Sequence, residues 1–188
     1  MKKYKLTTET LQFAGRTLHR IKAVKDFDSI KAGEFGGWIE NEKNLSQDDN
    51  AWIYGNAMVF DNAMVFDNAK VYGNANVSDY AKVYGNAEVY DYANISYYAK
   101  VYGNAVIKGD AIVHDAVDYI VFKNFWSSGR YFTWTSSNNK WSVGCFYGTG
   151  EELIKKAYAD SEKSGREYER VVRYVESILA DEKKEKSN

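Results

Sequence analysis

The chain has 188 residues, a formal net charge of −1 and a single cysteine, Cys145. The balanced charge gives no overall attraction to nucleic acid or anionic membranes, one cysteine excludes an internal disulfide, and no apolar stretch approaches the roughly 18 residues of a membrane span. The first residues are basic but lack the apolar segment of a secretion signal. We therefore expect a cytoplasmic protein of one or two domains that does not enter a membrane.

Residues 1–50 precede the regular part of the sequence, and we expect them to form an N-terminal β cap and an entry coil. Strand-forming residues at 11–13 and 17–21 flank Ala14-Gly15-Arg16, a combination that predicts a hairpin. Residues 33–39 are expected to lead into the next unit, and 44–46 to form an irregular coil. A repeating structure needs such an end because its outermost repeat would otherwise expose an apolar face.

A strict six-residue repeat occupies residues 51–116. Alanine occurs at every sixth position from Ala51 to Ala111, eleven times, and valine or isoleucine follows two residues later each time, from Ile53 to Val113. A helix would need apolar spacings of three and four. Period six fits a strand of about three residues and a tight turn, with both apolar positions pointing inward. Gly-Asn, Asp-Asn and Asp-Tyr pairs after the strands tolerate the positive φ of such turns.

This Val-x-x-x-Ala-x pattern resembles the hexapeptide repeat of left-handed parallel β-helices, the fold of many acyltransferases. The resemblance implies left-handed coils of triangular shape, with three hexads in each coil. Eleven hexads then make a little under four coils. We expect a mainly β protein, a left-handed parallel β-helix with an N-terminal β cap and a C-terminal α+β cap.

Three hexads per coil place residues i and i+18 above one another, so outward aromatic side chains should stack into ladders. The expected rows are Tyr54, Tyr72, Tyr90 and Lys108 on one face, Phe66, Tyr84 and Tyr102 on the second, Phe60, Ser78, Ser96 and His114 on the third, and Tyr80 with Tyr98 at a corner. Such tyrosines either stiffen the solenoid or form an interface. We assign to the expected binding surface Tyr54, Tyr72, Tyr90, Tyr84, Tyr102, Tyr80 and Tyr98.

After Val113 the period stops, and residues 117–181 are predicted to form the α+β cap. Three strands are expected at 119–122, 130–135 and 140–146. Five residues here could stack on bases, namely the aromatic Trp126, Tyr131, Trp134 and Trp141 and the guanidinium of Arg130, but we expect them to fill the core of the cap.

Two helices should close the cap. Thr149 with Glu152, and Ser164 with Glu167, have the spacing of capping boxes at helix starts. The second helix carries apolar residues at helical spacing, namely Tyr168, Val171, Val172, Val175, Ile178 and Leu179. The charged tail, 182–188, is expected to be frayed.

The layout as a whole resembles a group of uncharacterised hexapeptide-repeat proteins encoded by bacteria and their phages. The matching segments are 36–40, 44–46, the repeats, 143–146 and 148–149. That resemblance implies the fold but no shared activity. It suggests one specific role, a phage-encoded inhibitor of a host protein such as a defence component.

No catalytic constellation stands out in the sequence. Acetyltransferases of the hexapeptide class use a histidine base at a groove between subunits, and His114 is the weak candidate here; His19 lies in the N-terminal cap. Cys145 has no nearby histidine and is expected to be buried and structural. Recurring aspartates fall at corners, where they favour the turn. We predict no metal site and no cofactor, and nucleic acid is not the expected partner because no basic patch emerges.

The sequence therefore favours a non-catalytic protein-binding or scaffold module that forms a homo-oligomer, a trimer or dimer, and holds a protein partner. Two alternatives remain open. One is an acyl-CoA-dependent acetyltransferase, with His114 as its base. The other is a module that binds a small ligand or nucleotide in grooves between subunits.

Overall fold

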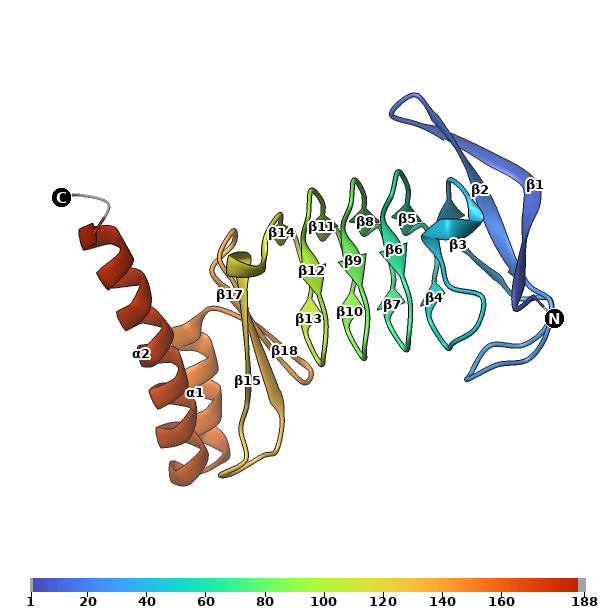
Figure 1. Cartoon of the computed structure of the whole chain (residues 1–188). Helices are drawn as coiled ribbons and strands as arrows, with labels where there is room; N and C mark the ends of the chain where they lie inside the picture. The colour runs from blue at the N-terminus through green and yellow to red at the C-terminus, as the bar shows by residue number, and fades with distance from the viewer. Residues whose placement is uncertain (1, 186–188) are drawn as a thin grey trace.

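A computed structural model describes residues 2–185. A solenoid of stacked coils forms the middle of an elongated molecule, with a hairpin at one end and a sheet with two helices at the other (Figure 1). The solenoid strands have two residues each, shorter than the predicted three: β4 (Trp52–Ile53), β5 (Met58–Val59), β6 (Met64–Val65), β7 (Lys70–Val71), β8 (Asn76–Val77), β9 (Lys82–Val83), β10 (Glu88–Val89), β11 (Asn94–Ile95), β12 (Lys100–Val101), β13 (Val106–Ile107) and β14 (Ile112–Val113).

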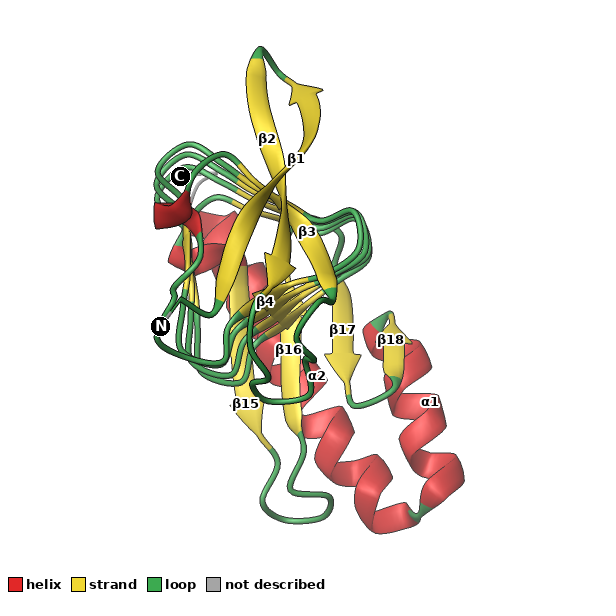
Figure 2. Cartoon of the chain, turned by 90° about the vertical axis from the view of Figure 1, so that its right-hand side faces the viewer, coloured by secondary structure: helices red, strands yellow, loops and turns green. Residues whose placement is uncertain are grey.

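The coils are triangular, and three parallel sheets run along the solenoid. The sheet orders are β4-β7-β10-β13, β6-β9-β12 and β5-β8-β11-β14, each strand pairing with strands one coil away. Viewed from the N-terminal end, β4, β5 and β6 follow one another anticlockwise as the chain recedes, so the coil is left-handed (Figure 2). Each repeat alanine and each repeat valine or isoleucine is buried. This confirms the predicted fold, because only stacked coils can bury both positions of every hexad.

The corners of the coils use the conformation that the turn residues predict. One residue per corner has a positive φ, and it is glycine or aspartate at every repeat corner except Tyr97, whose φ is 54°. Aspartates there also bind the coil above or below: the Asp67 carboxylate accepts from Gly85 N at 3.1 Å, and that of Asp79 accepts from Tyr97 N at 2.9 Å. The recurring aspartates therefore stabilise corners and coil stacking.

The N-terminal end is a hairpin that continues into the solenoid. β1 (Tyr4–Phe13) and β2 (Arg16–Ala23) are joined by Ala14 and Gly15, both with positive φ, the geometry of a type I′ turn. β2 pairs with β3 (Phe35–Ile39), which pairs in parallel with β5. The first coil of the solenoid therefore begins in β3.

The first coil differs from the others in its spacing. Ile39 lies beside Val59 and Leu45 beside Val65, an offset of i to i+20 rather than the i to i+18 of the regular coils, and a short 3₁₀ helix (Glu42–Asn44) lies between them. This is the irregular coil that the sequence predicted. The end is closed by Lys3, whose buried ammonium donates to the carbonyls of Asp49 and Ala51 at 2.9 and 2.8 Å.

The C-terminal cap is an antiparallel sheet covered by two helices. After a 3₁₀ turn (Ala116–Asp118) come β15 (Tyr119–Lys123), β16 (Tyr131–Thr135), β17 (Lys140–Val143) and β18 (Phe146–Gly148), in that spatial order. α1 (Gly150–Asp160) and α2 (Glu162–Glu185) pack on the face turned away from the solenoid. Their shared core includes Phe132, Trp141, Leu153, Tyr168 and Val172.

The structure of this cap differs from four of the predictions in detail. The segment 140–146 is two strands rather than one, because Gly144, with φ 56°, turns the chain, and Cys145 is exposed beside that turn rather than buried. The second helix begins at Glu162, and it is Ser161, not Ser164, whose hydroxyl accepts from a first-turn amide. The predicted frayed tail, 182–188, is helical through Glu185, and 186–188 lie outside the described residues.

Candidate binding surface

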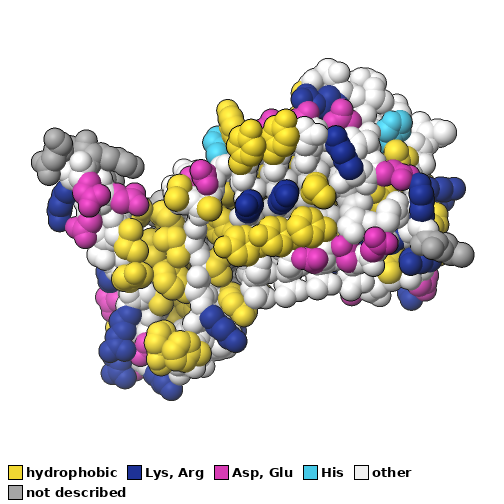
Figure 3. Space-filling view, viewed as in Figure 1, with side chains coloured by type: hydrophobic (Ala, Val, Ile, Leu, Met, Phe, Trp, Pro, Cys, Tyr) yellow, Lys and Arg dark blue, Asp and Glu magenta, His cyan; other side chains and the backbone are white. Residues whose placement is uncertain are grey.

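Three rows of outward side chains cover the face formed by β6, β9 and β12, which we call the ladder face (Figure 3). The upper row is Tyr80 and Tyr98, the middle row Met64, Lys82 and Lys100, and the lower row Phe66, Tyr84 and Tyr102. Lys82 and Tyr84 lie side by side because they alternate along the extended chain at β9 (Lys82–Val83) and therefore point the same way, and Tyr80 lies at the corner just before this strand. Each row repeats once per coil.

The aromatic rows are regular stacks. Tyr80 and Tyr98 have ring centroids 5.2 Å apart and nearly parallel planes, at 9°. In the lower row the centroids of Phe66 and Tyr84 are 4.9 Å apart, and those of Tyr84 and Tyr102 are 5.3 Å apart. Stacking restricts the rotation of the rings, while 53% of Tyr80 and 72% of Tyr98 stay exposed. A rigid exposed ring loses little entropy on binding.

The middle row adds positive charge between the aromatic rows. Lys82 and Lys100 are exposed, and neither ammonium forms an ion pair with any carboxylate of the described chain. A hollow of about 600 Å³ is lined by these lysines, the upper tyrosines and Asp115. The ladder face therefore combines flat aromatic rings with exposed lysine ammonium groups that have no carboxylate partner within residues 2–185.

The other predicted ladder lies on a different face, over β4, β7 and β10, and it is half-buried. Tyr54 stacks on Tyr72 at 4.7 Å, and Tyr72 meets Tyr90 edge to face at 5.9 Å. Burial raises the pKa of the Tyr90 hydroxyl to about 12 and raises the pKa of Tyr72 still further. The predicted stacking of residues i and i+18 is thus confirmed for both ladders, but the seven predicted tyrosines divide between two faces that differ in exposure.

Contacts from both caps cover this second ladder. Lys70, beside Tyr54, pairs with Asp28 of the N-terminal cap at 3.2 Å. At the other end the Lys108 ammonium lies 5.3 Å from the Tyr90 ring and 5.2 Å from the ring of Tyr147, which belongs to β18. These contacts make the second ladder more a structural feature than an open surface.

The two histidines are far from forming a catalytic pair. His114 is exposed at the end of β14, and its ring meets that of Tyr97 edge to face at 4.7 Å. His19 lies in β2, at the opposite end of the molecule. No carboxylate within residues 2–185 accepts a hydrogen bond from the His114 imidazole, so nothing orients it as a base. The described residues also contain no group of three metal-ligating side chains.

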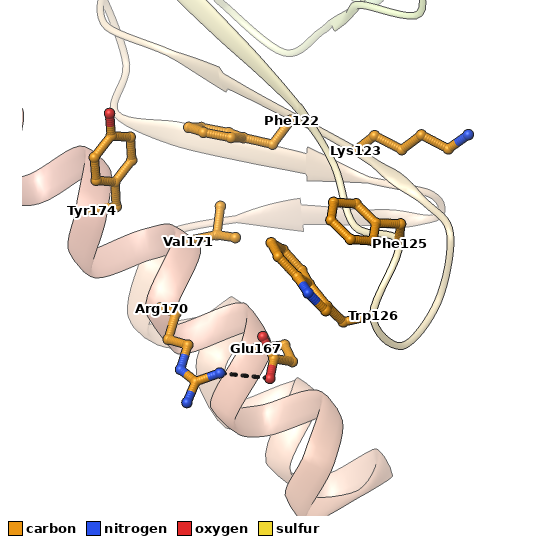
Figure 4. A pocket seen from close by; sticks show the side chains of 8 residues that line it. All are labelled: Phe122, Lys123, Phe125, Trp126, Glu167, Arg170, Val171 and Tyr174. Atoms are coloured by element: carbon orange, nitrogen blue, oxygen red, sulfur yellow. Dashed lines mark hydrogen bonds and ion pairs between the residues drawn. The ribbon is translucent and has the colours of Figure 1, made fainter.

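The cap aromatics are only partly in the core. Trp134 and Trp141 are buried as expected, but Trp126 and Arg130 are exposed and Tyr131 is half-buried. Trp126 stacks on Phe125 at 4.2 Å beside a cavity of about 420 Å³ between β15 and α2 (Figure 4). Its other lining residues are Phe122, Lys123, Glu167, Arg170, Val171 and Tyr174.

Sequence reasoning missed the lysines of the ladder face and this cavity. The lysines had a signal, because the repeated Ala-Lys-Val-Tyr at 81–84 and 99–102 places them one coil apart. The cavity had none, since its walls come from a loop and a helix that are distant from each other in the sequence.

Fold and surface together define a left-handed β-solenoid repeat protein. A family model described as the YdcK β-solenoid repeat matches residues 51–66 and 99–115, which lie in the regular coils. The chain is also similar to a protein of Escherichia coli (strain K12) named "Uncharacterized acetyltransferase YdcK", with 39% identity over 62 residues. That similarity covers 29% of this chain and 19% of the relative, so the chain spans about a fifth of the length of the protein it matches. No described helix is long and apolar enough to cross a membrane.

Proposed function

We propose that the protein is a non-catalytic binding module that holds a protein partner on the ladder face. The observation that supports this most is that stacked, exposed tyrosines lie on one face beside Lys82 and Lys100, which form no ion pair among the described residues. Tyrosine is enriched among the residues that dominate binding energy. The free ammonium groups favour a partner surface with acidic side chains beside apolar ones.

The proposed contact has a magnitude that an experiment can detect. Truncating two central aromatic residues of an interface removes about 2–4 kcal/mol, or roughly 30- to 1,000-fold in affinity. Reversing two lysine charges opposite carboxylates also weakens binding by about tenfold or more, mainly through faster dissociation and slower association. Neither pair of substitutions removes a core contact, because these side chains point outward.

The test is capture of a partner by the tagged full chain from bacterial lysate, followed by affinity measurement with the purified partner. The variants are Tyr80→Ala with Tyr98→Ala, and Lys82→Glu with Lys100→Glu. The matched control, Lys155→Glu with Lys156→Glu on α1, changes the net charge equally and alters exposed residues. We expect both ladder-face variants to lose the partner and the control to retain it. Equal retention by all three, or no stoichiometric partner, would contradict the proposal.

A further pair of substitutions tests the second predicted ladder. Tyr72→Ala with Tyr90→Ala removes the half-buried rings on the other face. If the partner binds the ladder face, this variant keeps its affinity, provided that the solenoid remains folded. Loss of binding here and not at Tyr98 would move the site to the other face. The narrower proposal, a phage-encoded inhibitor of a host protein, rests only on the resemblance of the overall layout; the identity of the captured protein tests it.

A second candidate, acetyl transfer from acetyl-CoA, is favoured by the similarity to the E. coli protein that is named an acetyltransferase. In that reaction an acceptor amine or hydroxyl attacks the thioester carbonyl, the thiolate of CoA leaves, and a base removes the acceptor's proton. His114 is the exposed histidine that could act as this base. Thiol release from acetyl-CoA with a panel of amines and sugars tests it. Turnover lost in His114→Ala and kept in His19→Ala would favour the enzyme.

A further inference from the structure

One strand of the C-terminal sheet has a free edge. β15 pairs with β16 alone, at the end of the sheet order. Asp118 O accepts from Ser136 N at 2.9 Å, and Asn124 N donates to Arg130 O at 2.8 Å, so the even-numbered residues of this segment bond toward β16. Backbone groups alternate between the two sides of a strand. The N–H and C=O groups of Tyr119, Val121 and Lys123 therefore point outward, away from the sheet.

Each face of this edge borders a cavity. On the solenoid side, Tyr119 and Val121 pack against the solenoid core, and a cavity of about 470 Å³ extends to Tyr102 and Tyr131. On the helix side lies the cavity of about 420 Å³ that Phe122 shares with Trp126 (Figure 4). Hydrophobic side chains gather on this part of the surface, where the cap meets the solenoid (Figure 3). An added strand would direct alternate side chains into the two cavities.

We propose that the free edge of β15 binds an extended segment of a partner protein as an additional strand. The segment carries apolar side chains at consecutive positions, one entering each cavity, and an acidic side chain near Lys123. The Lys123 ammonium lies 5.6 Å from the Tyr131 ring and has no carboxylate partner in the described chain, which gives the charge complementarity. Backbone hydrogen bonds supply affinity and the two cavities supply specificity in this kind of recognition.

The arrangement favours a partner of different sequence over a second copy of this chain. The β15 edge and the ladder face lie on the same side of the molecule in both views (Figures 1 and 2). A second copy that paired with β15 through a two-fold axis would bring its own Lys82 and Lys100 toward the same lysines of the first. Like charges that face each other disfavour that pairing. The strand site adjoins the ladder face, because Tyr102 lines its solenoid-side cavity, but it does not depend on the function proposed above.

Lys123 allows a sharp test because its side chain is exposed and its amide points outward. Lys123→Pro removes that donor without breaking a bond to β16, and proline is tolerated on edge strands. Lys123→Ala is the matched control, since it removes the charge and keeps the donor. The probe is the most enriched peptide from a displayed library of random peptides about 10 residues long, selected on the full chain. Fluorescence anisotropy of the labelled synthetic peptide gives its Kd for the wild type and both variants.

We expect the peptide to bind Lys123→Pro at least about tenfold more weakly than Lys123→Ala. The proline variant has no N–H at position 123, so one carbonyl of the peptide would stay without a hydrogen bond. Equal affinity for both variants, or a selection that enriches no peptide, would overturn the proposal. Thermal unfolding verifies that both variants are folded.

Hydrogen exchange on the wild-type protein gives a second, independent readout. The amides of Val121 and Lys123 should exchange quickly in the free protein and at least about tenfold more slowly with peptide bound, while those of Ile120 and Phe122 are slow throughout. Protection elsewhere would refute strand addition. Protection that grows with protein concentration alone, without peptide, would show a second copy at the edge and would also refute it.

Discussion

The positive-φ corners of the solenoid predict a specific order of stability for substitutions at Gly103. This residue has a φ of +68°, and a Cβ added there would meet no atom within 4 Å. Alanine therefore changes only the backbone energy, and the left-handed conformation costs an L-residue about 1–2 kcal/mol. Asparagine tolerates this conformation much better. We expect Gly103→Ala to be less stable than the wild type by about 1 kcal/mol, and Gly103→Asn by less than half of that.

A neighbouring corner separates this strain from crowding. At Gly85, with φ +69°, an added Cβ would lie 3.0 Å from Gly103 N, so Gly85→Ala should cost more than Gly103→Ala. Thermal unfolding measures the series, since 1 kcal/mol shifts the midpoint of a protein of this size by about 2–4 °C. An unchanged midpoint for Gly103→Ala, or asparagine as harmful as alanine, would refute the conformational argument.

Three more predictions concern the two ends of the molecule. Burial lowers the pKa of Lys3 from its ordinary 10.5 to about 8, so between these two pH values the unfolded chain binds more protons than the folded protein. The free energy of unfolding of the wild type, measured in urea relative to that of Lys3→Met, should therefore rise by up to about 3 kcal/mol as the pH increases from about 8 to 10.5. A difference that does not change with pH would disprove this prediction. Cys145 is exposed, so a maleimide should label the native protein fully and quickly; labelling only after unfolding would contradict the exposed turn. A Cβ on Gly165 would clash with the Tyr158 ring, so Gly165→Ala should lower the midpoint of thermal unfolding of the wild type. In the Tyr158→Ala background the clash is gone and alanine has the better helix propensity, so the same substitution should raise the midpoint. A change of the same sign in both backgrounds would exclude the clash.

The solenoid was predictable from the sequence because each hexad repeats the same pattern of buried, turn and outward positions. Three features of the sequence predict the same alignment of the coils: the apolar positions that must be buried, the turn residues that adopt positive φ, and the stacking of residues i and i+18. A single register therefore fits all the coils. The cap carries no such redundancy. Ser164 matches a capping box better than Ser161 does, yet the helix includes Gly165 because that glycine packs beneath Tyr158. Tertiary contact thus overrode a local signal.

The candidate surface was predictable in its geometry but not in its exposure. The period of three hexads placed every ladder tyrosine in its row. It could not show that Asp28 and Tyr147, from opposite caps, would cover the ends of the Tyr54 ladder and leave Tyr98 open. The free edge of β15 was also beyond reach, because a strand's position in its sheet depends on which partners it finds.

The carboxylate bonds at the corners have a consequence for how this molecule can change its size. Each of these hydrogen bonds joins one coil to the next, as the carboxylate of Asp79 does by accepting from Tyr97 N. An internal coil therefore contains the side chains that bind it to its neighbour. Gain or loss of three hexads would therefore lengthen or shorten the solenoid by one step of about 4.8 Å, with one rung added to or removed from each ladder. If the ladder face binds a protein as proposed, the number of coils sets the length of the surface that this protein contacts, and the two caps can stay unchanged while that length changes.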